Sequence, residues 1–147
     1  MKVDVLWTTP EPEKTIALAM RRCYSTKTLE EILLELESKG PGYWKHLIEL
    51  AIRDKSYDVI EHFCLLVLLE DCNEEEIHEV GIGNRYINFT RLKPGVYLAS
   101  LNARTLLELI YQNKYKRFGL EILRSIQQKR IADLFTSLIL EGVTFES

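Results

Sequence analysis

The stretch VIEHFCLLVLLE, from Val59 to Glu70, decides the fold because it contains the longest uninterrupted apolar run in the chain. That run, Phe63 to Leu69, has seven residues and carries too little polarity for a surface helix. Turn-forming segments bound the stretch, Ser56-Tyr57-Asp58 before it and Asp71-Cys72-Asn73 after it. Such a run is typical of a strand buried inside a sheet. The sequence therefore predicts a central strand over Val59 to Glu70.

Three shorter segments also have the composition of strands. Val3 to Trp7 alternates between apolar and other residues and is rich in β-forming side chains. Arg85 to Phe89 alternates in the same way, and Val96 to Ser100 follows a turn at Pro94-Gly95. Together with the central strand, these segments predict a small mixed or antiparallel sheet.

Helical apolar spacing fills most of the remaining chain. Thr8 or Thr9 is expected to cap a first helix, with Pro10 or Pro12 in its first turn. Thr28 and Glu31 form a capping box that opens a second helix. The expected helices cover about residues 10–24, 28–39, 43–53, a short turn after Asn73, 103–112, 115–128 and 130–140. The predicted fold class is α+β, a small sheet with helices packed on it.

Length and composition fit a single domain over residues 1–147. The chain has a mass of 17.2 kDa, and area scaling lets about 69% of its unfolded surface be buried on folding. The longest apolar run is too short to cross a bilayer, which takes about 20 residues in a helix. The start, Met1-Lys2-Val3-Asp4, lacks a secretory signal, so we expect a soluble cytoplasmic protein. A net charge of −3 argues against a nucleic-acid partner, which would require a basic excess.

Candidate metal and phosphate motifs are weak. The three cysteines are widely spaced and odd in number, so reduced thiols are expected. His62, Cys64, Cys72 and His78 are zinc-ligand types, but their spacing matches no compact ligand pair except the alternate positions 62 and 64 on a strand, and no metal is predicted. Gly81-Ile82-Gly83 lacks the third glycine of a dinucleotide fingerprint and predicts a bend instead. Three Gln beside many Glu and Lys favour a heat-adapted source.

Five short segments occur in a characteristic order along residues 3–125. They are Thr9-Pro10, Arg21-Arg22-Cys23-Tyr24, Glu61-His62 at the head of the apolar run, Gly83-Asn84-Arg85-Tyr86 and Asn102-Ala103-Arg104-Thr105-Leu106. In this order they resemble the flavin-dependent thymidylate synthases. That family has a Glu-His before an apolar strand, a Ser-x-Arg-Tyr, and an Asn-Ala-Arg-Ser-Leu at the start of a helix.

This resemblance implies a chemistry and a set of site residues. The family methylates dUMP to dTMP with FAD, NADPH and methylenetetrahydrofolate, and its members work as tetramers with FAD at subunit interfaces. By resemblance, His62, Asn102 and Arg104 would contact the FAD cofactor and Arg85 would contact the nucleotide. Structural roles compete with these: Asn102 can cap its helix, His62 can be a hydrogen-bonded structural histidine, and Arg85 can be a surface strand arginine. Arg104 is harder to explain structurally, because a cation in the first turn opposes the helix dipole.

The stretch that corresponds to the family's central Arg-His-Arg motif departs from it. Here Cys72 to Val80 contains no arginine and four carboxylates, and the motif serine is Gly83. Phosphates bind to cationic groups and amide donors, so carboxylates in their place repel them. If each lost charge-assisted contact contributed about 1.5 to 3 kcal/mol, two or three missing arginines would forfeit about 3 to 9 kcal/mol. That range corresponds to roughly a hundredfold to a millionfold in affinity.

The sequence therefore leaves three functions open, and it does not decide whether the chain is an enzyme. The favoured hypothesis is a shortened, catalytically degenerate member of the family that keeps the scaffold and its homo-oligomeric state, with no catalytic residue assigned. The second is an active enzyme on dUMP or another nucleotide, with cations supplied by neighbouring subunits. The third is a non-enzymatic interaction module that uses its amphipathic C-terminal helices.

Overall fold

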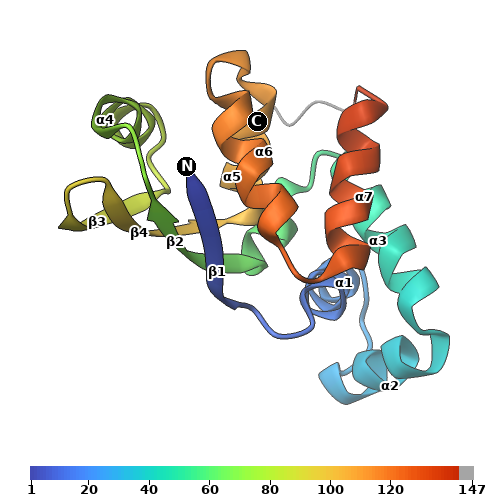
Figure 1. Cartoon of the computed structure of the whole chain (residues 1–147). Helices are drawn as coiled ribbons and strands as arrows, with labels where there is room; N and C mark the ends of the chain where they lie inside the picture. The colour runs from blue at the N-terminus through green and yellow to red at the C-terminus, as the bar shows by residue number, and fades with distance from the viewer. Residues whose placement is uncertain (143–147) are drawn as a thin grey trace.

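The computed structural model describes residues 1–142, in which a four-stranded sheet packs against helices (Figure 1). The strands are β1 (Lys2–Thr8), β2 (Cys64–Glu70), β3 (Asn88–Lys93) and β4 (Val96–Asn102). The α-helices are α1 (Pro12–Cys23), α2 (Leu29–Lys39), α3 (Pro41–Arg53), α4 (Glu74–Gly83), α5 (Ala103–Tyr111), α6 (Lys116–Ser125) and α7 (Lys129–Leu140). Two 3₁₀ helices, η1 (Tyr57–His62) and η2 (Asn113–Tyr115), connect them. Within residues 1–142, no helix is long and apolar enough to cross a membrane.

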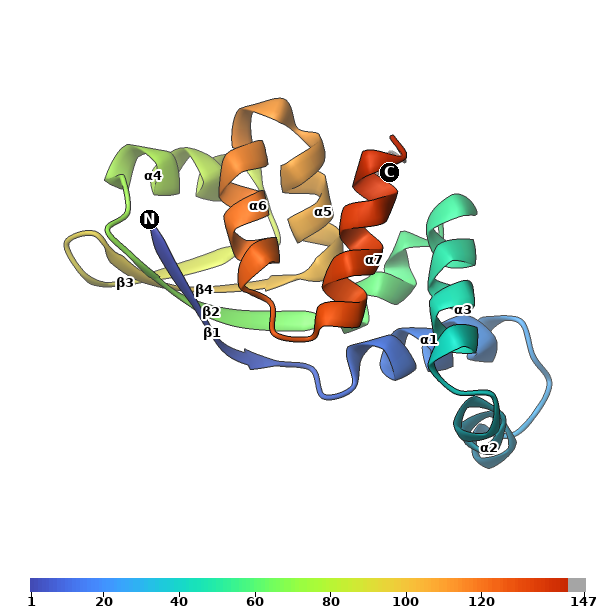
Figure 2. The ribbon, with the colours of Figure 1, turned by 45° about the vertical axis from the view of Figure 1, so that its right-hand side comes forward.

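The sheet is antiparallel throughout, in the order β1-β2-β4-β3. Helices α4, α5 and α6 lie over one face of it, and α1, α2 and α3 lie beyond the end where β2 begins (Figure 2). The predicted turn at Pro94-Gly95 joins β3 to β4, with Gly95 at the positive φ of 76° that glycine tolerates. The predicted α+β class is confirmed, and β2 is an inner strand as expected.

The strand at the centre of the sheet is shorter than predicted. In β2, Leu65, Val67 and Leu69 are buried under the helices, while the alternate residues face the other side of the sheet. The strand begins at Cys64 instead of Val59, because Tyr57–His62 form the 3₁₀ helix η1, whose apolar residues are also buried. The prediction of a strand over residues 59–62 is therefore wrong. Apolar composition alone does not distinguish a buried strand from a short buried helix.

The start of α2 follows the predicted capping signal, and the start of α1 does not. At α2, Thr28 Oγ1 accepts from the Glu31 N–H at 3.2 Å, and the Glu31 carboxylate accepts from the Thr28 N–H at 3.4 Å. This confirms the predicted capping box. At α1 the N-cap is Glu11, in a left-handed conformation with φ 43°, and not Thr8 or Thr9. Thr9 instead bonds to the strand beside it, so long-range pairing takes precedence over local capping.

Two boundaries around α4 also differ from the prediction. Gly81, Ile82 and Gly83 form the last turn of α4 and not a bend. The following strand begins at Asn88, three residues later than Arg85, so Arg85 lies in the connection. Gly81 packs beside the Phe89 ring, where an added Cβ would lie 3.5 Å from the ring. Close packing of the helix on β3 therefore uses a residue that the sequence suggested as a helix breaker.

The C-terminal helices turn their apolar faces into the core. Phe118 and Phe135 are buried, and the Phe135 ring stacks on Phe63 with 6.4 Å between centroids. Helices α5 and α6 approach closely at Gly119, where an added Cβ would lie 2.6 Å from Ile110 Cγ1. These faces are consequently occupied by the protein's own core and do not form the partner groove expected from their amphipathic spacing.

A carboxylate network ties the first three helices together. Glu35 on α2 accepts hydrogen bonds from Arg21 at 3.1 Å, Lys27 at 3.4 Å, Lys39 at 3.1 Å and the Tyr43 hydroxyl at 3.0 Å. The bond from Arg21, supported by Lys39 and Tyr43, lowers the pKa of Glu35 to about 2, although burial of the carboxyl opposes this. Glu35 therefore stays ionised well below the usual range of a glutamate.

Candidate functional site

Three chain segments meet where β2 begins, and they bring most of the predicted site residues together. Thr9 Oγ1 donates to the His62 carbonyl at 2.9 Å, and the Cys64 N–H donates to Thr9 Oγ1 at 2.9 Å. Cys64 pairs with Asn102 in the sheet, and the Ala103 N–H donates to the Phe63 carbonyl at 2.8 Å. These bonds place His62, Asn102 and Arg104, the residues that the resemblance assigned to FAD, at one end of the sheet.

Arg104 is held by two carboxylates of its own chain. Its Nη1 lies 2.8 Å from Glu61 Oε1, and its Nε lies 3.1 Å from Glu108 Oε1. The guanidinium carbon also lies 5.8 Å from the centre of the Tyr57 ring. Burial on its own would lower the pKa of Arg104, but the hydrogen bonds to Glu61 and Glu108 outweigh it and raise the pKa. We call Glu61, His62, Asn102, Arg104 and Glu108 the Arg104 cluster; its single guanidinium is already paired.

Asn102 performs the structural role that the sequence offered as one alternative. Its side-chain oxygen accepts from the Thr105 N–H at 2.9 Å, and Thr105 itself is buried. This is N-capping of α5, which satisfies one of the free amides at the start of a helix. His62 differs: its carbonyl is bonded to Thr9, while its side chain is exposed at the end of η1. The imidazole is thus the most accessible polar group of the Arg104 cluster.

Arg85 lies in the connection between α4 and β3, outside the Arg104 cluster. Its guanidinium lies 5.3 Å from the centre of the Tyr86 ring, and both side chains are exposed. The first residue of β3, Asn88, pairs with Ser100, so Arg85 is near the same end of the sheet. However, β4 separates it from β2 and from His62. The described contacts do not join Arg85 to the Arg104 cluster.

The acidic stretch Glu74 to Glu76 forms the start of α4. Asn73 caps this helix, as expected, by accepting from the N–H groups of Glu75 at 2.9 Å and Glu76 at 3.2 Å. Glu74 accepts from the Gly95 N–H at 2.7 Å and lies 3.5 Å from Arg91. Carboxylates in the first turn are favourable for the helix dipole. The acidic residues therefore stabilise α4, and they also give this part of the surface a negative field.

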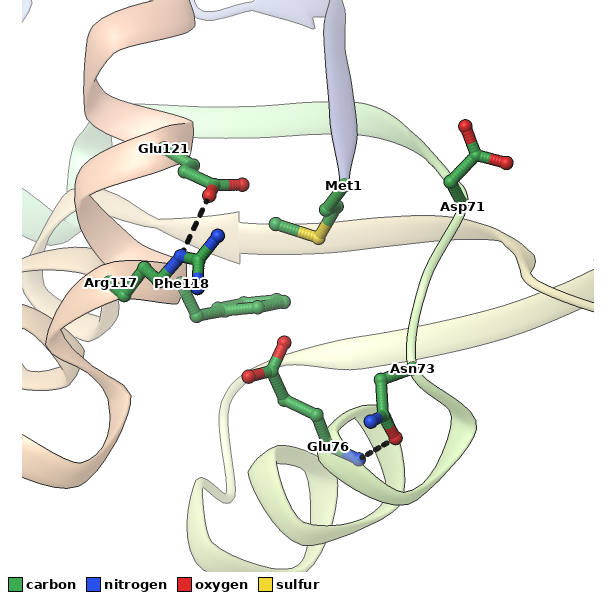
Figure 3. A pocket seen from close by; sticks show the side chains of 7 residues that line it. All are labelled: Met1, Asp71, Asn73, Glu76, Arg117, Phe118 and Glu121. Carbon is green, nitrogen blue, oxygen red and sulfur yellow. Dashed lines mark hydrogen bonds and ion pairs between the residues drawn. The ribbon is translucent and has the colours of Figure 1, made fainter.

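That field faces a cavity of about 230 Å³ (Figure 3). We call it the acidic cavity, and its lining residues are Met1, Asp71, Asn73, Glu76, Arg117, Phe118 and Glu121. The side chains of Met1, Phe118 and Glu76 point toward one another across it. Arg117 Nε lies 3.4 Å from Glu121 Oε1, but the Arg117 side chain is 90% exposed. Among residues 1–142, the other oxygen, Glu121 Oε2, is buried and has no hydrogen-bond partner.

The acidic cavity and the Arg104 cluster are separate regions. The cavity lies where β2 ends and β1 begins, and the cluster lies where β2 begins. Six residue steps along β2 separate the two by about 20 Å. The four residues of zinc-ligand type are also divided by β2, with Cys64 at the start of the strand and Cys72 after its end. Residues 1–142 contain no group of three or more His, Cys, Asp or Glu side chains arranged to hold a metal ion.

Sequence reasoning missed the partners that decide the charge of both regions. Glu108 follows Arg104 by four residues on the same helix, and this spacing in the sequence could have predicted their ion pair. Glu61 is brought to Arg104 only by the pairing of β2 with β4, so no local pattern predicts it. Arg117, Phe118 and Glu121 reach the acidic cavity only because α6 packs over the sheet.

Comparison with known proteins supports the fold and not a family. No protein-family model matches the sequence, and no curated protein is similar to it in sequence. Among solved structures, the chain is similar to thymidylate synthase X from Helicobacter pylori, crystallised with FAD and dUMP. The TM-score is 0.69, with 13% sequence identity, over 92% of this chain and 97% of the other. The two proteins share a fold across nearly their whole length.

Proposed function

We propose that this chain is a divergent relative of the flavin-dependent thymidylate synthases that keeps their scaffold and lacks their reaction. The shared fold supports the relationship, because the match extends over almost all of both chains. The loss of the reaction rests on one observation. The segment expected to provide cations for phosphates instead contributes carboxylates, including that of Glu76 in the acidic cavity.

Ligand chemistry explains why this substitution matters. FAD and dUMP, which the Helicobacter pylori protein binds, carry a diphosphate and a phosphate. Both are anions that need cationic groups or amide donors in a binding site. Arg117 in the cavity is mostly exposed and is paired with Glu121, and Arg104 at the other end of the sheet is paired with Glu61 and Glu108. Arg104 is therefore committed to two carboxylates of its own chain, and the carboxylates that line the cavity oppose a phosphate at Arg117.

The test is direct because FAD is coloured. Freshly purified protein is expected to show no flavin absorbance bands and no rise in melting temperature with millimolar FAD or dUMP, since a ligand that binds the native state must stabilise it. It is also expected to form no dTMP from dUMP with NADPH and methylenetetrahydrofolate. Yellow protein that forms dTMP would contradict the proposal.

One observation favours the alternative of an active enzyme with an altered site. The side chains of His62 and Arg85 are both exposed, so they are accessible to a flat or anionic ligand that a neighbouring subunit helps to hold. In that case FAD or dUMP raises the melting temperature, and His62→Ala or Arg85→Ala removes the rise. Lys27→Ala is a matched control, because Lys27 is an exposed cation on the helical side of the molecule. No shift with either ligand excludes this alternative.

A further inference from the structure

A cavity of about 390 Å³ lies between the starts of α1 and α7, and the proposed function does not involve it. Figures 1 and 2 both show the start of α7 beside α1. The cavity shares no lining residue with the acidic cavity or with the Arg104 cluster, and its volume is at the small end for ligand pockets. We call it the helix-start cavity, and the residues that line it include Pro12, Glu13, Trp44, Gln128, Lys129 and Arg130.

The wall of the helix-start cavity contains a buried carboxylate with little support from its own chain. The Glu13 side chain is 10% exposed, and its Oε2 lies 3.3 Å from Nε of Arg130, whose side chain is 66% exposed. Glu35 is buried to the same extent, yet it accepts hydrogen bonds from four side chains. Buried charges are normally paired and hydrogen-bonded in this fuller way. The Glu13 carboxylate is therefore able to accept a further donor, and a cationic donor binds it most strongly.

Gln128 contributes a second acceptor to the same wall. Its Nε2 donates to Thr8 Oγ1 at 2.7 Å, and the Thr8 hydroxyl donates in turn to the Thr9 carbonyl at 3.2 Å. These bonds fix the orientation of the amide, because a hydroxyl that already donates can only accept from Gln128. The other end of the amide, Oε1, is buried and has no hydrogen-bond partner within residues 1–142. A buried acceptor without a donor is unfavourable, so a ligand that supplies one gains affinity.

The start of α7 provides the opposite chemistry. No side chain caps this helix, so the amides of Lys129 and Arg130, its first two residues, have no acceptor among the described residues. Such amides and the helix dipole attract a negative group. Lys129 is exposed and forms no ion pair within residues 1–142, whereas the other lysine of the wall, Lys14, is paired with Glu37. This side of the helix-start cavity therefore offers a cation and backbone donors to an anionic group.

A ligand that suits both sides is a small zwitterion. We propose that the helix-start cavity binds a free α-amino acid with an apolar side chain. Its ammonium group bonds to the acceptors Glu13 and Gln128, and its carboxylate lies at the start of α7 beside Lys129. Its side chain packs on Trp44, which is 8% exposed and whose indole N–H already donates to the Leu36 carbonyl at 2.9 Å. This inference is independent of the proposed function, because a chain that lacks the reaction can still bind a small molecule.

Thermal melts of the full chain with matched ligands test the proposal. The probes are L-valine, L-leucine and L-phenylalanine, each beside the amine that lacks its carboxylate and the acid that lacks its ammonium group; for leucine these are isoamylamine and isocaproate. At least one amino acid is expected to raise the melting temperature by roughly 3 to 6 °C at about ten times its dissociation constant. Its amine and its acid are expected to give much smaller rises, because each binds to one side of the cavity only. No rise with any of the three amino acids at millimolar concentration would overturn the proposal, as would equal rises with the matched amine and acid.

Variants locate the binding site by calorimetric titration with the amino acid that gives the largest rise. Glu13→Gln keeps the shape of the side chain and removes its charge, and Lys129→Ala removes the cation at the start of α7. Each is expected to weaken binding by roughly tenfold to a hundredfold, which corresponds to one charge-assisted hydrogen bond. Lys116→Ala is the matched control and should bind like the wild type, because Lys116 is also an exposed lysine at the first position of a helix, α6. Unchanged binding by folded Glu13→Gln, or equal losses in the two lysine variants, would refute the site; the lysine pair decides alone if Glu13→Gln does not fold.

Discussion

The two ends of β2 differ in how their charged side chains are paired. In the Arg104 cluster, one partly buried guanidinium is paired with two carboxylates. The acidic cavity is lined by three carboxylates and a single arginine that is 90% exposed, and one buried carboxylate oxygen has no partner among the described residues. The comparison shows that a residue can match a binding motif and still be unavailable for a ligand, because its own chain already pairs with it. Arg104 matches the family's motif, yet its charge stabilises the chain's own fold.

The largest expected difference between the two ends lies in their arginines. Arg104→Ala leaves Glu61 and Glu108 close together without a cation, and we expect it to lower the free energy of unfolding by about 2 kcal/mol. Arg117→Ala, the same substitution at the acidic cavity, should cost less than about 0.5 kcal/mol because that pair is exposed. Urea denaturation of both variants measures the difference. Equal costs would mean that the two arginines are equivalent and that the contrast is wrong.

Acid titration extends the comparison to the carboxylate of Glu35, which accepts hydrogen bonds from four side chains. Because the pKa of Glu35 is lowered to about 2, its contribution to stability is present above the unfolded value of 4.5 and is lost as the pH falls from 4.5 toward 2. The full shift corresponds to roughly 3 kcal/mol, but solvent around the exposed Lys27 and Lys39 reduces this to about 1 to 2 kcal/mol. Glu35→Gln should flatten this part of the curve of unfolding free energy against pH. A curve unchanged by the substitution would rule out the network as its cause.

At the helix caps, substitutions at the two ends of β2 should have similar effects on stability. Asn102→Ala removes the cap of α5, and Asn73→Ala removes the cap of α4. Each is expected to lower the free energy of unfolding by about 1 kcal/mol, since the bonded backbone amides are left without that acceptor. The Asp variants should restore most of the loss. A much larger cost for Asn102→Ala than for Asn73→Ala would indicate a role at the Arg104 cluster beyond capping.

The smallest expected effect has opposite signs at the two ends. Glu121→Gln removes a charge from among other carboxylates and should raise the free energy of unfolding by up to about 0.5 kcal/mol. Glu108→Gln removes one of Arg104's two carboxylates and should lower it by about 1 kcal/mol. Thermal melts of the two variants, run side by side, measure the signs. Destabilisation by Glu121→Gln would show that the ion pair with Arg117 outweighs the repulsion from the other carboxylates.

Predictions from sequence succeeded where the deciding interaction is local. The Thr28 capping box and the caps at Asn73 and Asn102 involve residues two or three positions apart, so the printed order of residues contains them. The apolar run correctly indicated the inner strand, which pairs with a strand on each side and buries Leu65, Val67 and Leu69 under the helices. The antiparallel sheet followed from short strands and a Pro-Gly turn.

Failures occurred where tertiary contacts decide. Tyr57–His62 is helical because its apolar residues reach the core in that form, which composition cannot distinguish from a strand. Thr9 was expected at a helix cap, but it bonds to Cys64, 55 positions away. The site residues were partly placed: His62, Asn102 and Arg104 do lie together, whereas the pairing of Arg104 with Glu61 depends on strand register. The assignment of these residues to FAD, and of Arg85 to the nucleotide, stays a prediction.

The position of β1 also has a consequence for how the chain folds during synthesis. β1 pairs only with β2, and the bonds of Thr9 to His62 and Cys64 close a loop of more than fifty residues. Because β1 is synthesised before β2, it stays unpaired with β2 until residue 70 has left the ribosome, while α1, α2 and α3 emerge and can already pack together. Fusing a slowly translated segment before β2 would lengthen the time for which β1 is exposed to other chains.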